Sequence, residues 1–316
     1  MRIIRYLIFL ILFVSLGAIG FFPKALHLNS QAKPEYEDNL PAIIREDEFY
    51  SATALEQQGQ SLVAAGNLGK IVHTRDNGKQ WIELQSDTDL DVFDIQNWDS
   101  ERLIAVGQQG LILRSTDGGE TWSDVSAPYK QGVSQRGINK IIRISTRSGG
   151  HALGVGQWNM VMETTDYGQT WKRISPAEDL NLYGVDLVDR DRAFVVGEFG
   201  ELMRGTRNDT GQWSWEKVRT PVDQTLKAID FRTPQQGVAV GLNGLIIRTG
   251  DGGDSWEAVT EGDSPHLYDV AWSGDRWYAV GEGGQLVMAD QQARDWNRTK
   301  LSDAEFGWFT RVEPLG

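Results

Sequence analysis

The chain has 316 residues, of which 40% are hydrophobic and 24% charged, and this composition excludes a disordered or collagen-like polypeptide. It contains no cysteine, which excludes a disulfide scaffold, a cysteine nucleophile and thiolate metal sites. The net charge of −13 argues against binding to a nucleic-acid backbone, and the four scattered histidines lack the spacing of metal ligands.

The first residues of the chain have the pattern of an export signal. Arg2 and Arg5 precede residues 7–22, an uninterrupted run of apolar or small residues. The positive-inside rule places the two arginines in the cytoplasm and the rest of the chain across an inner membrane. The run is at the short end for a membrane span, so cleavage and retention as a single-span anchor both stay open, with retention preferred. We expect a signal peptide or N-terminal membrane anchor over residues 1–28, a polar linker over residues 29–48, and a periplasmic location.

Six segments of about forty residues then repeat along the chain. Each has a glycine that ends an apolar run, a tight turn, another apolar run, an Asp- and Gly-rich turn, and a tryptophan. The lead glycines are Gly66, Gly107, Gly156, Gly197, Gly241 and Gly281, at spacings of 41, 49, 41, 44 and 40 residues. The closing tryptophans are Trp81, Trp122, Trp171, Trp215, Trp256 and Trp296. With a further apolar run before each glycine, every unit holds four short strands, which is the pattern of one β-propeller blade.

The repeat predicts an all-β fold, a β-propeller of four-stranded blades over residues 49–316. A β-sandwich would not repeat its turn chemistry so faithfully, and the 3.6-residue period of helical repeats is absent. Beyond six full units, residues 305–312 resemble the first strand of another. We expect this strand and residues 40–45 to build a reduced seventh blade that joins the two ends of the propeller. A six-bladed ring with an accessory strand is the alternative.

Four of the Asp- and Gly-rich turns follow the pattern S/T-x-D-x-G-x-x-W, over residues 74–81, 115–122, 164–171 and 249–256. The aspartate can accept hydrogen bonds from amides of its own turn, the glycine supplies a positive φ, and the tryptophan covers the hairpin. We predict structural roles for Asp76, Gly78, Trp81, Asp117, Gly119, Trp122, Asp166, Gly168, Trp171, Asp251, Gly253 and Trp256. The turns of the fourth and sixth units depart from the pattern and should be looser.

These four turns resemble the Asp-box, or bacterial neuraminidase repeat. The fuller unit, V-G-x-x-G-x-I-x-x-T-x-D-G-G-x-T-W, resembles the photosystem II assembly and stability factor-like propeller family over roughly residues 49–316. The resemblance implies a propeller, usually of seven blades, that helps to assemble or stabilise a membrane complex. In non-photosynthetic bacteria such proteins look more like companions of membrane transporters. The family also has arginine-rich patches that dock partners, although no motif transfers those positions to this chain.

Motifs of catalysis are missing from the sequence, which has no G-x-S-x-G, S-x-x-K, P-loop or dinucleotide fingerprint. A sialidase would carry an F/Y-R-I-P motif before its boxes, whereas Phe231-Arg232-Thr233-Pro234 follows the fourth unit. The Asp-box aspartates lie one to a blade at the periphery, and Asp89 and Asp91 fit loop solvation better than acid/base work. We therefore expect no enzyme activity, cofactor or metal. A glycan-binding or sialidase-like propeller remains the alternative.

The turn between the second and third strands of each unit lies on the same face as the connection to the next blade. On that face Trp158 and Phe199 stand where equivalent turns carry polar residues. Exposed aromatic side chains in adjacent blades are typical of protein-recognition sites, although packing against neighbouring loops would explain them equally well. We expect this face to bind a partner through Trp158, Phe199, Gln108, Gln109 and Glu198.

The longest insertion gives a second indication of partner binding. Residues 125–147 contain no acidic residue, in a chain that is strongly acidic overall. The basic residues there are Lys130, Arg136, Lys140, Arg143 and Arg147. A loop with Tyr129, Lys130 and Arg136 should project from the face of Trp158 and, with Lys140, dock an acidic partner loop or lipid headgroups. Alternatively, some of these charges lie on strands and solvate a sheet edge.

We interpret the chain as a non-catalytic exported propeller that acts as a scaffold, assembly or stability factor for an integral membrane protein complex, for example a transporter. Nucleic acid is not an expected partner, and any attachment to the inner membrane would run through residues 3–22. The innermost strands should form a packed, acid-lined channel with Asp94, Asp186, Asp230 and Asp269.

Overall fold

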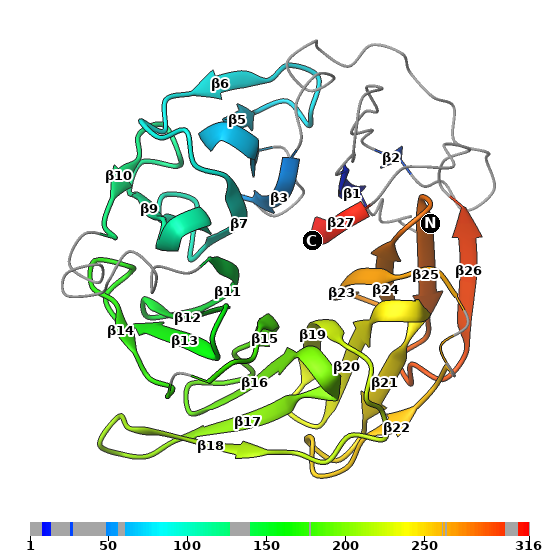
Figure 1. Ribbon diagram of the computed structural model, residues 1–316. Helices are drawn as coiled ribbons and strands as arrows, with labels where there is room; N and C mark the ends of the chain where they lie inside the picture. Colours follow the sequence, from blue (N-terminus) through cyan, green and yellow to red (C-terminus); the bar gives the residue numbers. More distant parts are fainter. Residues whose placement is uncertain are drawn as a thin grey trace, which may run out of the picture.

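The computed structural model is a ring of antiparallel β-sheets around a central axis (Figure 1). The structure describes residues 8–13, 26–27, 49–55, 61–126, 140–176, 178–260, 262, 264–300 and 309–315. Six of the sheets have four strands, taken consecutively from the chain, with the first strand nearest the axis and the fourth at the rim. This is the strand order of a propeller blade, so the six sequence repeats are six blades.

The strands of each blade follow one another with short turns. Blade 1 has β3 Phe49–Ala54, β4 Leu62–Gly66, β5 Ile71–Thr74 and β6 Ile82–Leu84. Blade 2 has β7 Val92–Asn97, β8 Leu103–Gly107, β9 Ile112–Ser115 and β10 Ser123–Asp124. Blade 3 has β11 Ile141–Arg147, β12 His151–Gly156, β13 Met160–Thr164 and β14 Lys172–Arg173. Blade 4 has β15 Leu182–Asp186, β16 Arg192–Gly197, β17 Leu202–Arg207 and β18 Trp213–Lys217. Blade 5 has β19 Leu226–Thr233, β20 Gln236–Gly241, β21 Ile246–Thr249 and β22 Glu257–Ala258. Blade 6 has β23 Leu267–Ser273, β24 Arg276–Gly281, β25 Gln285–Ala289 and β26 Trp296–Lys300.

Apolar side chains fill the space between neighbouring blades. The second strand of each blade is buried over nearly its whole length, because both faces of the blade are covered. Five apolar clusters each draw residues from two adjacent blades, from blades 1 and 2 through to blades 5 and 6. In the first of them Val63 of blade 1 packs with Leu103 of blade 2, and neither is exposed. The core is therefore a series of layers between blades.

Side-chain hydrogen bonds also join the innermost strands in a belt around the axis. In each link a side-chain oxygen of one inner strand accepts a backbone N–H at or next to the following inner strand. The links are Ser51 with Ile95 at 3.3 Å, Asp94 with Ile144 at 2.9 Å, Ser145 with Leu187 at 3.1 Å, Asp186 with Phe231 at 2.9 Å, Asp230 with Trp272 at 2.7 Å, and Asp269 with Val312 at 2.9 Å. The predicted acid-lined axis thus exists, and its aspartates connect blades.

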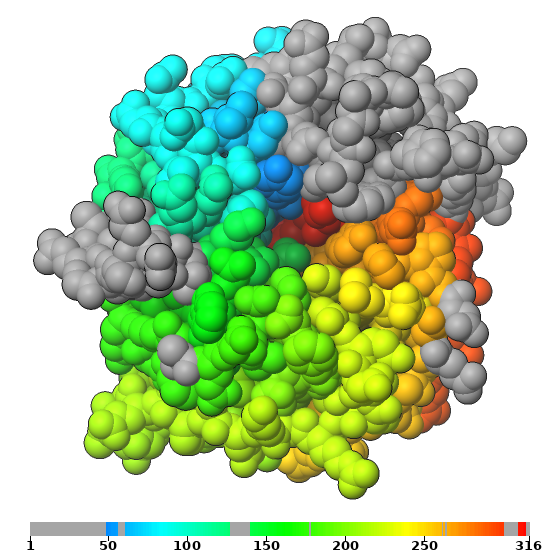
Figure 2. Space-filling model, in the orientation of Figure 1, coloured from blue at the N-terminus to red at the C-terminus, as the bar shows by residue number. Residues whose placement is uncertain are grey.

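The last link reaches a strand that follows all six blades, β27 Phe309–Leu315. The hydroxyl of Thr310 donates to the carbonyl oxygen of Tyr50 at 3.2 Å, which joins β27 to blade 1. Figure 2 shows β27, in red, between the blue of blade 1 and the orange of blade 6. The strand therefore completes the inner ring at a seventh position.

A three-stranded sheet contains β27, in the order β2-β1-β27. Its other members are β1 Ile8–Phe13 and β2 Leu26–His27. A C-terminal strand is present over residues 309–315 and overlaps the predicted range 305–312, of which residues 305–308 lie outside the described residues. Residues 40–45 lie outside the described residues. Among the strands that the structure describes, six four-stranded blades are present and a four-stranded seventh blade is not shown. In the same described ranges, no helix combines the length and apolarity needed to cross a membrane.

Candidate functional site

The turns between the second and third strands form a matched set on one face of the propeller. Four are 3-10 turns, at Asn67–Gly69, Gln108–Gly110, Glu198–Gly200 and Leu242–Gly244. The middle residue of each turn has a positive φ, with values of 50° for Leu68, 53° for Gln109, 60° for Trp158, 56° for Phe199, 57° for Asn243 and 67° for Gly283. The equivalent positions of six blades therefore adopt the same left-handed backbone.

Three of these middle residues are large, apolar and exposed. The exposed fractions are 70% for Leu68, 45% for Trp158 and 78% for Phe199. A left-handed backbone costs a residue other than glycine roughly 1–2 kcal/mol, least for asparagine and aspartate. Neither the backbone nor the exposure of these side chains helps the isolated propeller to fold. The coincidence of both features in blades 1, 3 and 4 is typical of a recognition surface. We call Leu68, Trp158 and Phe199 the turn tips.

The first residue of several turns accepts a hydrogen bond from the chain segment that connects two blades. The side chain of Gln108 accepts the backbone N–H of Asp91 at 3.4 Å, and that of Glu198 accepts the backbone N–H of Asn181 at 3.0 Å. Burial raises the pKa of Glu198, but hydrogen bonds from Asn181 and Tyr183 outweigh it and lower the pKa. Both side chains, which the sequence assigned to partner binding, hold the connection between blades. Gln109, the middle residue of its turn, is exposed.

The basic insertion is divided by the fold. Tyr129, Lys130 and Arg136 lie outside the described residues. The Lys140 ammonium lies 5.2 Å from the centre of the Phe93 ring, on the exposed side of the blade connection. Arg143 points to the axis instead, where it lies 3.5 Å from Asp269. Arg147 donates to the carbonyl oxygen of Leu187 at 2.7 Å, in the next blade. Side chains alternate along β11, and Arg143 lies on the side that faces the axis, whereas Arg147 at the end of the strand is exposed.

The Asp-box turns have the geometry that their pattern implies. In blade 2 the Asp117 carboxylate accepts the Thr121 N–H at 3.0 Å, and the Ser115 hydroxyl accepts the Gly119 N–H at 2.9 Å. The same pair of contacts recurs around Asp76, Asp166 and Asp251. In blade 4, Asn208 accepts the N–H groups of Thr210 and Gln212, so this turn keeps the hydrogen bonding although it lacks the box.

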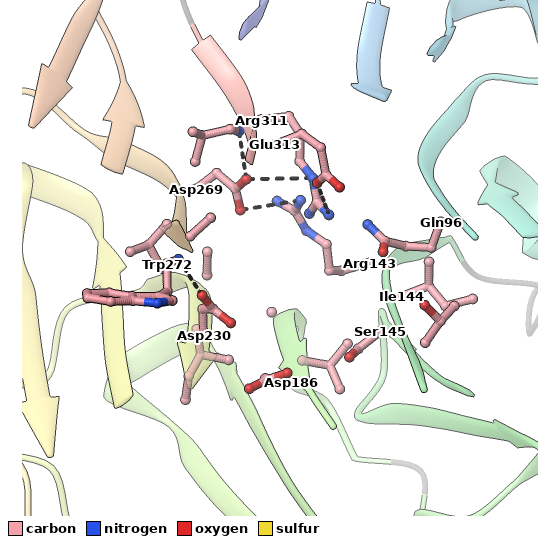
Figure 3. Close-up of a pocket in the computed structure, with 18 residues that line it drawn as sticks. Gln96, Arg143, Ile144, Ser145, Asp186, Asp230, Asp269, Trp272, Arg311 and Glu313 are labelled. Atoms are coloured by element: carbon pink, nitrogen blue, oxygen red, sulfur yellow. Dashed lines mark hydrogen bonds and ion pairs between the residues drawn. The ribbon is translucent and has the colours of Figure 1, made fainter. Parts of the chain in front are cut away.

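A pocket of about 230 Å³ lies on the axis, among the innermost strands (Figure 3). Arg143 and Asp269 point toward one another across it, and Arg311 lies 3.7 Å from Asp269 and 3.8 Å from Asp94. Asp186 and Asp230 line the side of the pocket away from the two arginines. The pocket is therefore divided into a sector where charges are paired and a sector where two carboxyl groups face each other.

Burial shifts the proton affinities of these carboxyl groups. It raises the pKa of Asp230 to about 6, against the hydrogen bond from the Trp272 N–H. Burial and the nearby Asp230 raise the pKa of Asp186 well above its usual value. Burial also raises the pKa of Glu313 to about 7, although Arg311 acts in the opposite direction. In the folded chain these carboxyl groups therefore lose their protons at a higher pH than in the unfolded chain.

Among the described residues, the pocket does not have the free arginines and the tyrosine that a sialidase needs. Its arginines, Arg143 and Arg311, are already engaged with Asp269, and no tyrosine lines it among the described residues. Arg232, from the motif that resembled a sialidase, stacks 4.7 Å from the Trp272 ring. No group of three or more potential metal-ligating side chains occurs within the described ranges. Nothing in this geometry favours the glycan-active alternative.

A buried polar cluster between blades 3 and 4 could not be predicted from the sequence. The Glu163 side chain is fully buried and lies 2.8 Å from the Lys172 ammonium, 3.1 Å from His151 and 3.2 Å from Arg207. It also accepts the indole N–H of Trp213 at 2.8 Å. Burial alone would raise the pKa of Glu163, but these partners hold the pKa at about 2. The cluster fastens the outer parts of two blades together.

A comparison with protein families identifies the propeller family to which the chain belongs. The family model described as "Photosynthesis system II assembly factor YCF48" matches residues 77–180 and 207–316, more than half of the chain. The chain belongs to the YCF48 family. This confirms the family resemblance predicted from the repeats. The curated relative "Photosystem II stability/assembly factor HCF136, chloroplastic" from Cyanidioschyzon merolae is 36% identical over 70 residues, which are 22% of this chain but only 14% of that protein.

Solved structures of the YCF48 family have the same fold. YCF48 from Cyanidioschyzon merolae superposes with a TM-score of 0.60 at 17% identity, covering 81% of this chain and 86% of that one. A structure described as YCF48 bound to D1 peptide has a TM-score of 0.62 at 18% identity, covering 80% and 81%. The WD40 repeats of RRP9 reach 0.62 at 10% identity, covering 86% and 82%. At these identities the structural likeness shows the propeller fold alone.

Proposed function

We propose that this YCF48-family propeller is a non-catalytic assembly or stability factor that binds a subunit of an integral membrane protein complex through the turn tips. Leu68, Trp158 and Phe199 carry the proposal, because these three exposed apolar side chains occupy equivalent turn positions on one face of the propeller. A relative described as bound to a D1 peptide supports protein recognition as the activity. A transporter complex is a further candidate partner. Lys140, together with Lys130 and Arg136, would contact acidic groups at the edge of this surface.

The sequence pattern supports a periplasmic location for this activity. Residues 7–22 would carry the chain across the inner membrane and hold it there or be removed afterwards. The propeller would then meet the exported parts of membrane subunits. We also propose that β27 is the innermost strand of a reduced seventh blade, because the belt of hydrogen bonds includes it on both sides.

Asparagine substitutions at the turn tips test the binding surface without harming the fold. Asn243 occupies the equivalent position in blade 5, so Trp158→Asn and Phe199→Asn introduce a residue that this turn already accepts. The tagged full chain would be crosslinked in membranes, and the captured complex compared between wild type and the double variant. We expect recovery of one membrane complex to fall at least tenfold in the double variant.

Two control variants separate the turn tips from general surface hydrophobicity. Asn243→Gly changes the equivalent position of blade 5 to the residue that blade 6 has there, and Ile82→Thr removes an apolar residue that is 63% exposed at the rim. Both should recover the complex like the wild type. Equal recovery from wild type and the double variant, with both folded, would contradict the proposed surface.

A further inference from the structure

The two outer flanks of the six-blade series are apolar walls that face the seventh position. On blade 1 the wall consists of Phe49, Ala52, Leu62, Ala64 and Val72, all at most 2% exposed. On blade 6 it consists of Tyr278, Val280 and Leu286, which pack with Phe309 and Val312 of β27. At the five other interfaces such a wall is covered by the next blade. The seventh position therefore requires apolar strands to cover both walls.

The innermost strand at this position is fixed in place. Phe309 and Val312 of β27 are 3% and 1% exposed, and Arg311 is held between Asp94 and Asp269. Burial opposes the charge of Arg311, but these two aspartates raise the pKa of the guanidinium above its usual value. Because β27 is held from both neighbouring blades, its remaining edge can accept a strand without rearrangement of the ring.

Strand β1 occupies that edge with the register of a true second strand. It pairs antiparallel with β27, with Ile11 opposite Val312, and the register shifts by one residue between Leu12 and Phe13. The inner pair of every blade has such a shift at the same end, as in blade 1 between Phe49 and Ser51. The hexapeptide IFLILF of Ile8–Phe13 therefore takes the place of the second strand, which is the most buried strand of each blade.

The same hexapeptide belongs to the run that the sequence assigns to export. Residues 7–22 cannot lie in a bilayer and pair with β27 at the same time. We propose that the edge of β27 is a strand-binding site, and that it takes an extended apolar segment of a membrane partner when residues 7–22 are in the membrane. In the free molecule β1 of the same chain occupies the site in place of the partner segment. The proposal depends on the expected export of the chain but not on the turn tips.

The chemistry of the position defines the partner segment. Main-chain hydrogen bonds to β27 require an extended segment of about six residues that runs antiparallel to it. The apolar walls require large aliphatic or aromatic side chains on both faces of that segment, as in IFLILF. A proline within the segment would remove a donor and prevent pairing.

A disulfide tests the site in the full chain, which has no cysteine of its own. Ile11→Cys and Val312→Cys place two thiols on directly paired residues, and cysteine suits the buried site of Val312. The double variant would be oxidised in detergent and reconstituted in vesicles of phosphatidylethanolamine and phosphatidylglycerol. The probe is a fluorescent peptide with the sequence of residues 8–13 between lysines. We expect the oxidised protein to bind it at least tenfold more weakly than the same protein after reduction.

Three controls define what each outcome means. Leu10→Cys with Val312→Cys puts the thiols on opposite faces of the sheet, so it should form no disulfide and bind the probe under both conditions. A probe with proline in place of Leu10 and Leu12 should bind at least tenfold more weakly. Phe199→Asn should bind the original probe as tightly as the wild type does. Loss of the membrane complex by this variant then tests the turn tips alone, and loss of probe binding tests the strand-binding site alone.

Several results would overturn the proposal. These are equal probe binding by the oxidised and reduced protein, equal binding of the proline probe, and failure of the disulfide to form in detergent. A disulfide-linked dimer would identify a second copy of the chain as the occupant. If Ile11→Cys with Val312→Cys lowers the melting temperature, Ile8→Cys with Leu315→Cys uses the end of the same pairing.

Discussion

The turn tips show how one backbone position serves two purposes. Asn243 and Gly283 suit the left-handed turn, whereas Leu68, Trp158 and Phe199 at the same position are large, apolar and exposed, as the proposed contact with a partner requires. The hairpin fixes the positive φ, and the packing of the rest of the blade holds this strained conformation in place. Conformational strain and exposure are thus concentrated in three side chains that the fold does not need.

Phe199→Asn should therefore make the propeller more stable while it weakens partner binding. The expected gain in the free energy of unfolding is about 0.5–1 kcal/mol, because asparagine adopts the left-handed backbone more easily than phenylalanine. Urea unfolding of purified protein measures it. The reciprocal change Asn243→Phe should lose a similar amount, and a loss of stability in Phe199→Asn would show that this side chain packs against the propeller.

The repeat alignment predicted the exposed aromatic residues but not the whole surface. Trp158 and Phe199 were recognisable because aromatic residues contrast with the polar residues of the equivalent turns. Leu68 lies at the same position, yet an aliphatic residue in an alternating strand pattern gives no comparable contrast. The hydrogen bonds of Gln108 and Glu198 to the blade connections could not be predicted, because whether a turn side chain faces outward or back toward the chain depends on the neighbouring connection. Their part in partner binding stays a prediction.

Single elements are held to their neighbours by buried polar contacts as well as by apolar packing. Glu163 on β13 contacts His151 on β12 and Lys172 on β14 within its own blade, and it also contacts Arg207 and Trp213 in the next blade. The fully buried carboxylate is acceptable only because cations and donors surround it. The outer edges of blades 3 and 4 thus depend on one acidic side chain.

Glu163→Gln should destabilise the propeller by about 3 kcal/mol. The amide keeps the shape but leaves Arg207, whose side chain is only 15% exposed, without its buried counter-charge. Chemical denaturation at neutral pH measures the loss. Glu216→Gln is the matched control, because Glu216 pairs with Arg204 at 2.6 Å but is 59% exposed, and such pairs contribute less than about 1 kcal/mol. Equal losses in both variants would contradict the role of burial at Glu163.

The blades themselves were predictable because the strands and turns of each lie within about forty residues of sequence. The Glu163 cluster was not, since Arg207 and Trp213 follow Glu163 by more than one repeat length and nothing local marks them as its partners. The position of Arg143 could not be predicted either. The run of basic residues left docking of a partner and solvation of a sheet edge both open, and the Arg143 side chain lies at the axis instead, 3.5 Å from Asp269.

At the scale of the whole molecule, the axis concentrates negative charge in a closed ring of strands. Asp94, Asp186, Asp230 and Asp269 connect neighbouring blades, and Arg311 neutralises part of their charge. The six repeats and the apolar pattern after them predicted this ring and its closing strand. At the register position of Arg311 the blades carry Ser51, Asp94, Arg143, Gly184, Ala228 and Asp269, so the contacts of this arginine with Asp94 and Asp269 could not be predicted from the repeat.

Stability of the ring should fall as the pH rises. The folded state raises the pKa of Asp230 from 3.8 to about 6, so the stabilising protonated form is fully present below pH 3.8 and is lost as the pH rises through 6. Asp230→Asn keeps an acceptor for the Trp272 N–H and removes this dependence. We expect the variant to be about 1–2 kcal/mol more stable than the wild type at pH 8, with a smaller difference at pH 5.

Urea unfolding at the two pH values tests this expectation. Asp99→Asn is the control of opposite sign: burial raises the pKa of Asp99, but hydrogen bonds from Arg102 outweigh it and lower the pKa. That variant should therefore lose stability at pH 8. If Asp230→Asn were less stable than the wild type at pH 8, the Asp230 carboxylate would be ionised and stabilising in the native ring.

The place of β27 in the chain also sets the order of folding. Blades 1 to 6 can each form from consecutive residues while the chain is being made, but the inner ring stays open until β27 emerges and bonds to Asp269 of blade 6 and Tyr50 of blade 1. The contact between Thr310 and Tyr50 spans 260 residues, and contacts of large sequence separation form slowly. During that interval the flanks of blades 1 and 6 are available to any apolar strand nearby. The strand that fills the seventh position of each new molecule is thus determined by whether β27 or another apolar strand pairs there first.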